Sequence, residues 1–226
     1  MSKVVDIRTA MDHVKSGDTV MIGGFASCGT PLNLLSELKK RDVRHLTTIS
    51  EDFHNAVKRF DLGLTPLLKK NMIDEIIVSF FGHREAQEKI DAGEIKLTLV
   101  PQGTLAERIR AGGAGLGGFF TPVGVGTIVE EGKETRVING KKYLLEMPLR
   151  ANVALLKCHT ADPLGNAVFA YTARNFNCVM ATAADVVILE CEHLVQQGEI
   201  APDEVHLPGI FVDYVVYCGE GAVDER

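Results

Sequence analysis

Short apolar runs alternate with helical patterns through the first half of the chain. The runs are almost continuously apolar and rich in β-branched residues, as expected for strands buried on both faces of a sheet. They cover residues 20–24, 46–50, 76–80 and 96–100. Amphipathic segments around them predict helices over 6–15, 31–40, 83–92 and 104–110. The pattern therefore predicts an α/β fold, with an open, mostly parallel sheet flanked by helices.

The pattern changes after Arg110. Residues 111–126 hold seven of the chain's 22 glycines, and Asn139-Gly140 stands between apolar flanks, a strong signal for a tight β-hairpin. Strand-like runs resume over 153–157, 167–171, 186–190 and 212–217. We expect a single domain over 1–218, a glycine-rich loop and β-hairpin inserted at about 111–147, and a flexible tail over 219–226.

Composition and charge narrow the class of protein. The formal net charge is −6, which argues against nucleic acid as a partner, because proteins that bind it concentrate Lys and Arg. No run approaches the roughly 20 apolar residues that span a bilayer, so we expect no membrane association. The N-terminal residues resemble neither a secretory signal nor a transit peptide. The five cysteines are scattered without a C-x-x-C spacing, which favours reduced thiols in a cytoplasmic protein.

The first candidate site is a glycine-containing loop between a predicted strand and a predicted helix. Glycines at the carboxyl end of a parallel strand let the backbone approach a ligand, and the next helix start offers free N–H groups to an anion. Thr30 and Pro31 fit an N-cap followed by a proline at N1. A tight connection that binds nothing explains the same pattern. The loop, named below the glycine loop, consists of Gly23, Gly24, Phe25, Ala26, Ser27, Cys28 and Gly29.

Two further features are a cysteine in the glycine loop and a second group of glycines further along the chain. Cys28 lies near the predicted helix start, which can activate a thiol, but no base is close in sequence and we interpret it as a bystander. Gly113, Gly115 and Gly118 satisfy the G-x-G-x-x-G spacing. A helix precedes that motif and no helical pattern follows it, which is the wrong context for a dinucleotide site. A mobile loop against a ligand or partner fits better.

Polar residues end two other predicted strands. Gln102 follows the run 96–100, where its amide can donate a hydrogen bond to an oxyanion or serve only as a turn residue. Glu51 and Asp52 end the run 46–50; neighbouring side chains point in different directions, so we expect one of the two only to be solvated. The histidines show neither an H-E-x-x-H motif nor an i, i+4 pair, and we predict no metal.

Taken together, these segments resemble the α-subunit of class I coenzyme A transferases over essentially the whole chain. The family signature, an apolar triplet followed by G-G-F-x-x-x-G-x-P, is matched by residues 20–31. Upstream the signature prefers Asp or Asn before Gly or Asn, where this chain has Ser16-Gly17. Further matches are Pro101-Gln-Gly-Thr104, Arg110-Ala-Gly-Gly-Ala-Gly115, Thr121-Pro-x-Gly-x-Gly-Thr127 and Ala173-Arg-Asn-Phe-Asn177.

The resemblance implies a Rossmann-like coenzyme A transferase fold and a ping-pong reaction. Coenzyme A is then a substrate, with no tightly bound cofactor. A glutamate of the β-subunit, within a Ser-Glu-Asn-Gly motif, forms a glutamyl-CoA thioester during transfer between an acyl-CoA and a short carboxylic acid. The acid would be acetoacetate, butyrate, acetate or a related 3-oxo or amino acid. The assembly implied is an α₂β₂ heterotetramer that is active only when both kinds of chain are present.

The resemblance also assigns residues. Gln102 becomes an oxyanion or carboxylate contact, and the glycine loop becomes a segment that contacts coenzyme A. Ser50-Glu51-Asp52-Phe53 matches only the first two residues of the nucleophile motif, and lies where the family usually carries Asn in this half. Glu51 is therefore not assigned as the nucleophile.

Glu51 and Asp52 instead become candidate substrate-binding residues, which would suit an amine-bearing or short neutral acyl group. A sugar-phosphate isomerase or sensor of related fold, and a non-catalytic acyl-CoA-binding protein, are the alternative functions.

Overall fold

The structure is a computed structural model and describes residues 2–54 and 63–219. Its centre is an eight-stranded sheet with the order β13-β12-β10-β1-β2-β4-β6, in which β11 pairs antiparallel with β10 and every other pair is parallel. The strands are β1 (Thr19–Ile22), β2 (Leu46–Ile49), β4 (Ile73–Val78), β6 (Lys96–Leu99), β10 (Ala151–Ala161), β11 (Ala167–Val168), β12 (Ala184–Leu194) and β13 (Tyr214–Tyr217). The predicted α/β class with a mostly parallel sheet is confirmed.

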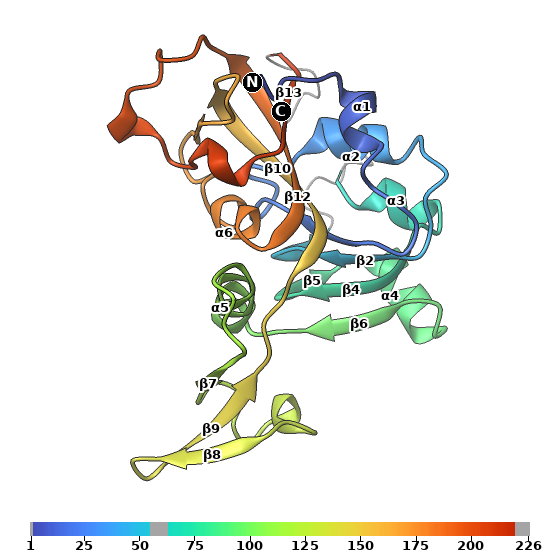
Figure 1. Ribbon diagram of the computed structural model, residues 1–226. Coiled ribbons are helices and arrows are strands. Elements are labelled where there is room, and N and C mark those ends of the chain that lie inside the picture. Colours follow the sequence, from blue (N-terminus) through green and yellow to red (C-terminus); the bar gives the residue numbers. More distant parts are fainter. Residues whose placement is uncertain (1, 55–62, 220–226) are drawn as a thin grey trace.

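Helices cover both faces of this sheet (Figure 1). They are α1 (Ile7–Met11), α2 (Leu32–Leu38), α3 (Thr65–Lys69), α4 (Arg84–Asp91), α5 (Gln102–Gly113) and α6 (Asn177–Ala181), with short 3₁₀ turns η1 (Ile128–Glu130), η2 (Pro202–Glu204) and η3 (Gly209–Phe211). Helices α1 to α4 pack on one face, and α5 and α6 pack on the other.

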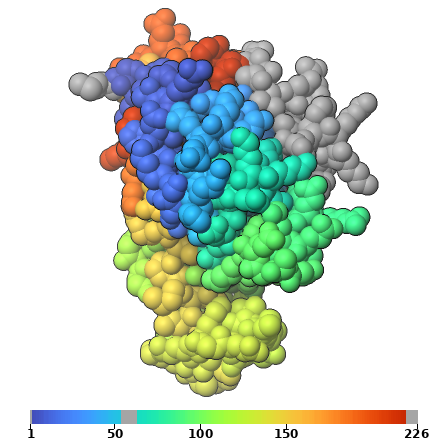
Figure 2. All heavy atoms as spheres, turned by 90° about the vertical axis from the view of Figure 1, so that its right-hand side faces the viewer, coloured from blue at the N-terminus to red at the C-terminus, as the bar shows by residue number. Residues whose placement is uncertain are grey.

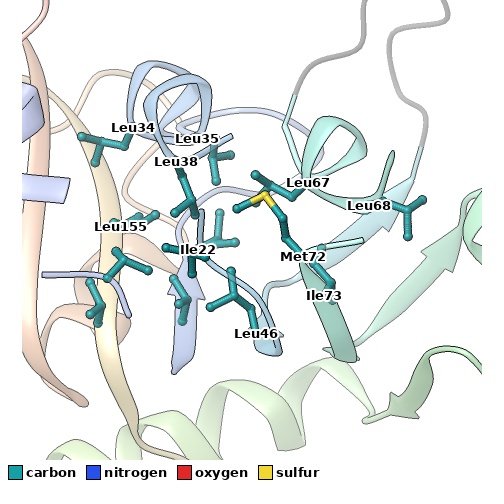
Figure 3. Packing of buried hydrophobic residues seen from close by; sticks show 14 of the residues in the cluster. Ile22, Leu34, Leu35, Leu38, Leu46, Leu67, Leu68, Met72, Ile73 and Leu155 are labelled. Atoms are coloured by element: carbon teal, nitrogen blue, oxygen red, sulfur yellow. The ribbon is translucent and has the colours of Figure 1, made fainter. Parts of the chain in front are cut away.

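The two faces bury separate apolar cores, and strand alternation divides the side chains between them. In β1, Val20 and Ile22 join the core under α1 to α4, whereas Met21 joins the core under α5 and α6. Figure 3 shows the first core, where Leu34 and Leu38 of α2 approach Leu155 of β10. Burial on both faces explains the apolar side chains of an inner strand such as β1, whereas β6, at the edge of the sheet, is partly exposed, contrary to the prediction for the run 96–100.

A small sheet projects from the main body, as predicted for the inserted region. It has the order β7-β9-β8, formed by β7 (Phe119–Thr121), β8 (Thr135–Ile138) and β9 (Lys141–Glu146). Asn139 and Gly140 turn the β8–β9 hairpin with φ values of 52° and 77°, as a type I′ turn requires. Figure 2 shows this part as a separate lobe below the main body.

Ion pairs connect the projecting sheet to the main body. Glu146, at the end of β9, is 1% exposed and pairs with Lys133 and Arg108. The Arg108 side chain also donates from Nε to the carbonyl oxygen of Met147, 2.7 Å away. The buried Glu146 carboxylate with its two cationic partners thus connects the projecting sheet to α5.

Several local predictions differ from the structure. The helix predicted over 6–15 is limited to α1, and the run 76–80 spans the end of β4 and the start of another strand. The N-cap of α2 is Pro31, without a side-chain cap hydrogen bond, so Thr30 is not the cap. The helix predicted over 104–110 runs from Gln102 to Gly113, and the predicted strand over 167–171 is confined to β11. Within the predicted tail only Gly219 is described. Among the described residues, none of the helices is both long and apolar enough to cross a bilayer.

Candidate functional site

The carboxyl ends of four neighbouring parallel strands bring the predicted site residues to one edge of the sheet. The glycine loop follows β1, Glu51 follows β2, Ser79 follows β4, and Gln102 follows β6 at the start of α5. This edge is where open α/β sheets bind ligands. A small parallel sheet of β3 (Asp52–His54) and β5 (Phe80–Gly82) lies directly beyond it.

The glycine loop folds into a tight turn. The backbones of Phe25 and Cys28 exchange two hydrogen bonds of 3.1 and 2.8 Å. Ala26 and Ser27 between them have φ values of 49° and 70°, a left-handed conformation that costs an L-residue roughly 1–2 kcal/mol. The Asp52 carboxylate offsets part of this cost, because its Oδ2 accepts the Ala26 N–H at 2.6 Å. Asp52 therefore shapes the loop from the neighbouring strand.

The segment 175–177 contacts the glycine loop through two side-chain amides. The Asn175 amide donates to the Cys28 carbonyl oxygen at 2.9 Å, and the Asn177 amide donates to that of Gly29 at 3.1 Å. Asn177 is fully buried, and its Oδ1 accepts the Lys157 N–H at 3.1 Å. A Cβ at Gly23 would lie 2.0 Å from that same Oδ1, so only glycine fits there.

Helix α2, which follows the loop, is capped from a distant strand. Glu190 of β12 accepts the Leu34 N–H at 2.9 Å and an Asn33 amide hydrogen at 3.3 Å. Its side chain supplies the N-terminal acceptor that Pro31 cannot. Burial raises the pKa of Glu190 to about 7, and the donors of α2 and the charge of Lys157 offset this only partly.

Glu51 and Gln102 meet directly. Glu51 is 5% exposed, and its Oε1 accepts hydrogen bonds from Ser79 Oγ at 2.8 Å and Gln102 Nε2 at 3.2 Å. Its backbone carbonyl oxygen accepts the N–H groups of Ser79 and Phe80 at 2.9 and 3.2 Å. The expectation that one member of the Glu51-Asp52 pair is only solvated is wrong, because each carboxylate accepts a hydrogen bond from a neighbouring segment.

Two further sequence candidates, Cys28 and the start of the glycine-rich segment, have packing and hydrogen-bonding contacts. The Cys28 sulfur lies 3.2 Å from the Thr172 hydroxyl, which is not a base. Gly112 and Gly113 form the last turn of α5, where added Cβ atoms would lie 1.9 Å from Leu149 O and 2.2 Å from Thr182 Oγ1. The start of the glycine-rich segment is thus a packed helix end and not a mobile loop.

Four polar residues of the site carried no role in the sequence prediction. Ser79 could have been found as the first polar residue after β4. Asn175 and Asn177 lie in the family-like segment 173–177. Glu190 offers a weaker signal, a carboxylate within an apolar strand, which usually needs a specific partner. These residues are Ser79, Asn175, Asn177 and Glu190.

His159, Glu192 and His193 form a cluster at the ends of β10 and β12 whose ligand atoms lie within 4.8 Å of one another. His159 Nδ1 is 2.7 Å from Glu192 Oε2. Lys157 Nζ is 3.2 Å from the other oxygen of this carboxylate, so a positive charge already occupies it and opposes a cation. The cluster is better explained as an ion-pair network.

Known proteins resemble this chain over nearly its full length. The family model described as Coenzyme A transferase matches residues 4–217. The α-subunit of an acetate CoA-transferase of Escherichia coli K12 is 43% identical over 220 residues, covering 97% of this chain and 98% of the relative. The corresponding subunit of a succinyl-CoA:3-ketoacid coenzyme A transferase of Helicobacter pylori J99 is 44% identical over 222 residues, covering 97% and 94%.

A solved structure shares the fold. It is an acyl-CoA transferase of Escherichia coli O157:H7, solved as a thioester complex with CoA, with a TM-score of 0.84 and 21% identity. The match covers 96% of this chain and 47% of that one, so this chain spans about half of that transferase. The comparisons favour the transferase prediction over the sugar-phosphate isomerase and non-catalytic alternatives.

Proposed function

The chain belongs to the coenzyme A transferase family as its α-subunit, and from that premise we propose that it forms one half of a composite active site. The other half comes from a β-subunit that carries the nucleophilic glutamate in a Ser-Glu-Asn-Gly motif. The observation that carries the proposal is the convergence of the glycine loop, Glu51 and Gln102 at the carboxyl edge of the sheet. An α₂β₂ assembly in the cytoplasm is part of the proposal.

The proposed reaction passes through acyl and thioester forms of the partner's glutamate. Its carboxylate attacks the thioester carbonyl carbon of the acyl-CoA, the C–S bond breaks, and the CoA thiolate leaves. The thiolate then attacks the glutamyl carbonyl of the resulting anhydride, which releases the free carboxylate and leaves a glutamyl-CoA thioester. The second acid reverses these two steps and departs as its CoA ester.

Each addition step of this proposed reaction places negative charge on a carbonyl oxygen. Gln102 lies at the site edge and can donate an amide N–H to that oxygen, and it stands at the N-terminal end of the 12-residue helix α5, whose dipole favours negative charge. Gln102 is therefore the proposed catalytic donor from this chain.

The glycine loop is the proposed contact for coenzyme A. Phe25, Ala26 and Ser27 are exposed at its tip, and their turn is held by Asp52 and Asn175. A preformed loop can bind a ligand without a large ordering cost. Glu51 and Asp52 would influence the substrate through the residues that they hold, and the substrate itself is proposed as a short-chain carboxylic acid.

Co-expression with a β-subunit provides the test. The purified complex is incubated with acetoacetyl-CoA or butyryl-CoA, treated with borohydride, and examined by mass spectrometry. The expected result is a reduced glutamyl residue on the β-subunit that is absent when the α-chain is omitted. Transfer of CoA to acetate without such a modification would contradict the mechanism, and a complex without any transfer would contradict the function.

A further inference from the structure

Glu51 is buried beside the proposed oxyanion donor, and no step of the proposed reaction uses it. We propose that Glu51 is a positioning residue, which holds the Gln102 amide so that its nitrogen, and not its oxygen, serves the site. The inference rests on the proposed function of Gln102 and adds a residue to it.

Glu51 is itself held firmly. Its backbone oxygen is occupied by the N–H groups of Ser79 and Phe80. The single hydroxyl hydrogen of Ser79 has two acceptors in reach, the Glu51 backbone oxygen at 2.9 Å and Oε1 at 2.8 Å. Because two N–H donors already serve the backbone oxygen, that hydrogen is available to the carboxylate. The carboxylate is thereby fixed relative to the end of β4.

Gln102, by contrast, is exposed, and an exposed glutamine has many rotamers and can present either end of its amide. An ionised carboxylate offers only acceptors. Contact with Glu51 Oε1 therefore selects the orientation in which Nε2 faces Glu51. One of the two Nε2 hydrogens is used in this bond, and the other remains for a reacting oxygen. An amide at position 51 would satisfy either orientation and would not select one.

Loss of this selection has a kinetic signature. In Glu51→Gln the turnover number falls because Gln102 loses its fixed orientation, and that loss disappears once Gln102 itself is removed. A merely structural residue would not give this pattern.

The test uses Glu51→Gln in the complex with the β-subunit. We expect kcat to fall about tenfold, less than the roughly 10²–10³-fold expected on losing the oxyanion donor itself. The effect on kcat should vanish in the Gln102→Ala background, since residues that act through one another are not additive. Glu75→Gln is the matched control, because Glu75 also accepts a hydroxyl hydrogen bond, from Thr98 Oγ1 at 3.1 Å, but lies toward the amino end of β4.

A direct readout separates this inference from the proposed function. The side-chain ¹⁵N amide signals of Gln102 should differ from those of a free glutamine side chain and exchange slowly in the wild type, and should move toward the free values in Glu51→Gln. Ser79→Ala, which keeps the charge but loosens Glu51, should give an intermediate signal if Glu51→Gln does not fold. An inactive wild-type complex would overturn the proposed function alone. Unchanged amide signals, or additive losses of kcat, would overturn the positioning role.

Discussion

Glu51 and Gln102 are 51 positions apart in the sequence, yet the Gln102 amide donates to the Glu51 carboxylate at 3.2 Å. The contact exists because β2 and β6 lie on either side of β4 in a parallel sheet and end at the same edge. It joins a predicted oxyanion donor to the acidic residue that departs from the family pattern. The predictions below follow from this edge of the sheet and from the segments that support it.

Gln102→Ala should reduce the turnover of the complex with the β-subunit by roughly 10²–10³-fold, the usual scale for one oxyanion donor. Steady-state kinetics at saturating substrates measure the change. Gln87→Ala is a suitable control, since Gln87 is an exposed helical glutamine of α4 that bonds to Asp91 at 2.8 Å. Near wild-type turnover in Gln102→Ala would remove Gln102 from the catalytic role.

Asp52→Ala should raise the KM for acyl-CoA with little change in kcat. The Ala26 N–H loses its carboxylate acceptor, and a hydrogen bond to a charged group contributes about 1.5–3 kcal/mol, so the left-handed turn becomes less populated. Ala26→Gly, which removes the steric cost at φ 49°, should partly restore the KM in the double variant. A KM that stays unchanged in Asp52→Ala would show that the glycine loop does not bind coenzyme A.

Gly23→Ala should destabilise the chain by about 1–3 kcal/mol, the range for overpacking a filled site. The new Cβ would lie 2.0 Å from Asn177 Oδ1, so the buried amide and its bonds to Lys157 and Gly29 must shift. Urea unfolding measures the difference. Gly103→Ala is the matched control: nothing lies within 4 Å of its Cβ, and alanine within a helix stabilises by up to about 1 kcal/mol. Equal stabilities for the two variants would contradict this packing.

Glu190 should make stability depend on pH. Its folded pKa of about 7 exceeds the ordinary value of 4.5, so the folded state retains a proton that the unfolded state has lost. The resulting contribution to the free energy of unfolding is fully present below pH 4.5 and is lost as the pH rises to about 7. The total loss is roughly 3 kcal/mol, at 1.36 kcal/mol per pKa unit. Glu190→Gln keeps an acceptor for Leu34 but does not ionise.

Urea unfolding of the wild type and of Glu190→Gln at several pH values tests this prediction. The difference in unfolding free energy between Glu190→Gln and the wild type should grow in favour of the variant between pH 4.5 and 7. A constant difference across that window would mean that Glu190 does not retain its proton on folding.

The sequence alone determined the fold class and the positions of the main candidates. The run 20–24 is apolar because its strand, β1, lies inside the sheet and is buried on both faces, and this signal is local. The run 96–100 predicted its strand as well, but β6 is an edge strand that is partly exposed. Asn139-Gly140 predicted its hairpin for an equally local reason, the need for positive φ at both residues. Motif matches added Gln102 and the glycine loop.

Tertiary structure alone decided what those residues contact. Whether Glu51 meets Gln102, or Asp52 meets Ala26, depends on strand order and register, which a sequence does not display. The cap of α2 was mispredicted at Thr30 because the actual acceptor, Glu190, lies more than 150 residues away. The end of α5 was placed too early for a similar reason: the glycines at 112 and 113 suggested a loop, but they are needed because Leu149 and Thr182 pack where their side chains would be. Local conformational preferences are weaker than such tertiary contacts. The sequence therefore indicated which residues belong to the site, and the fold determined how they contact one another.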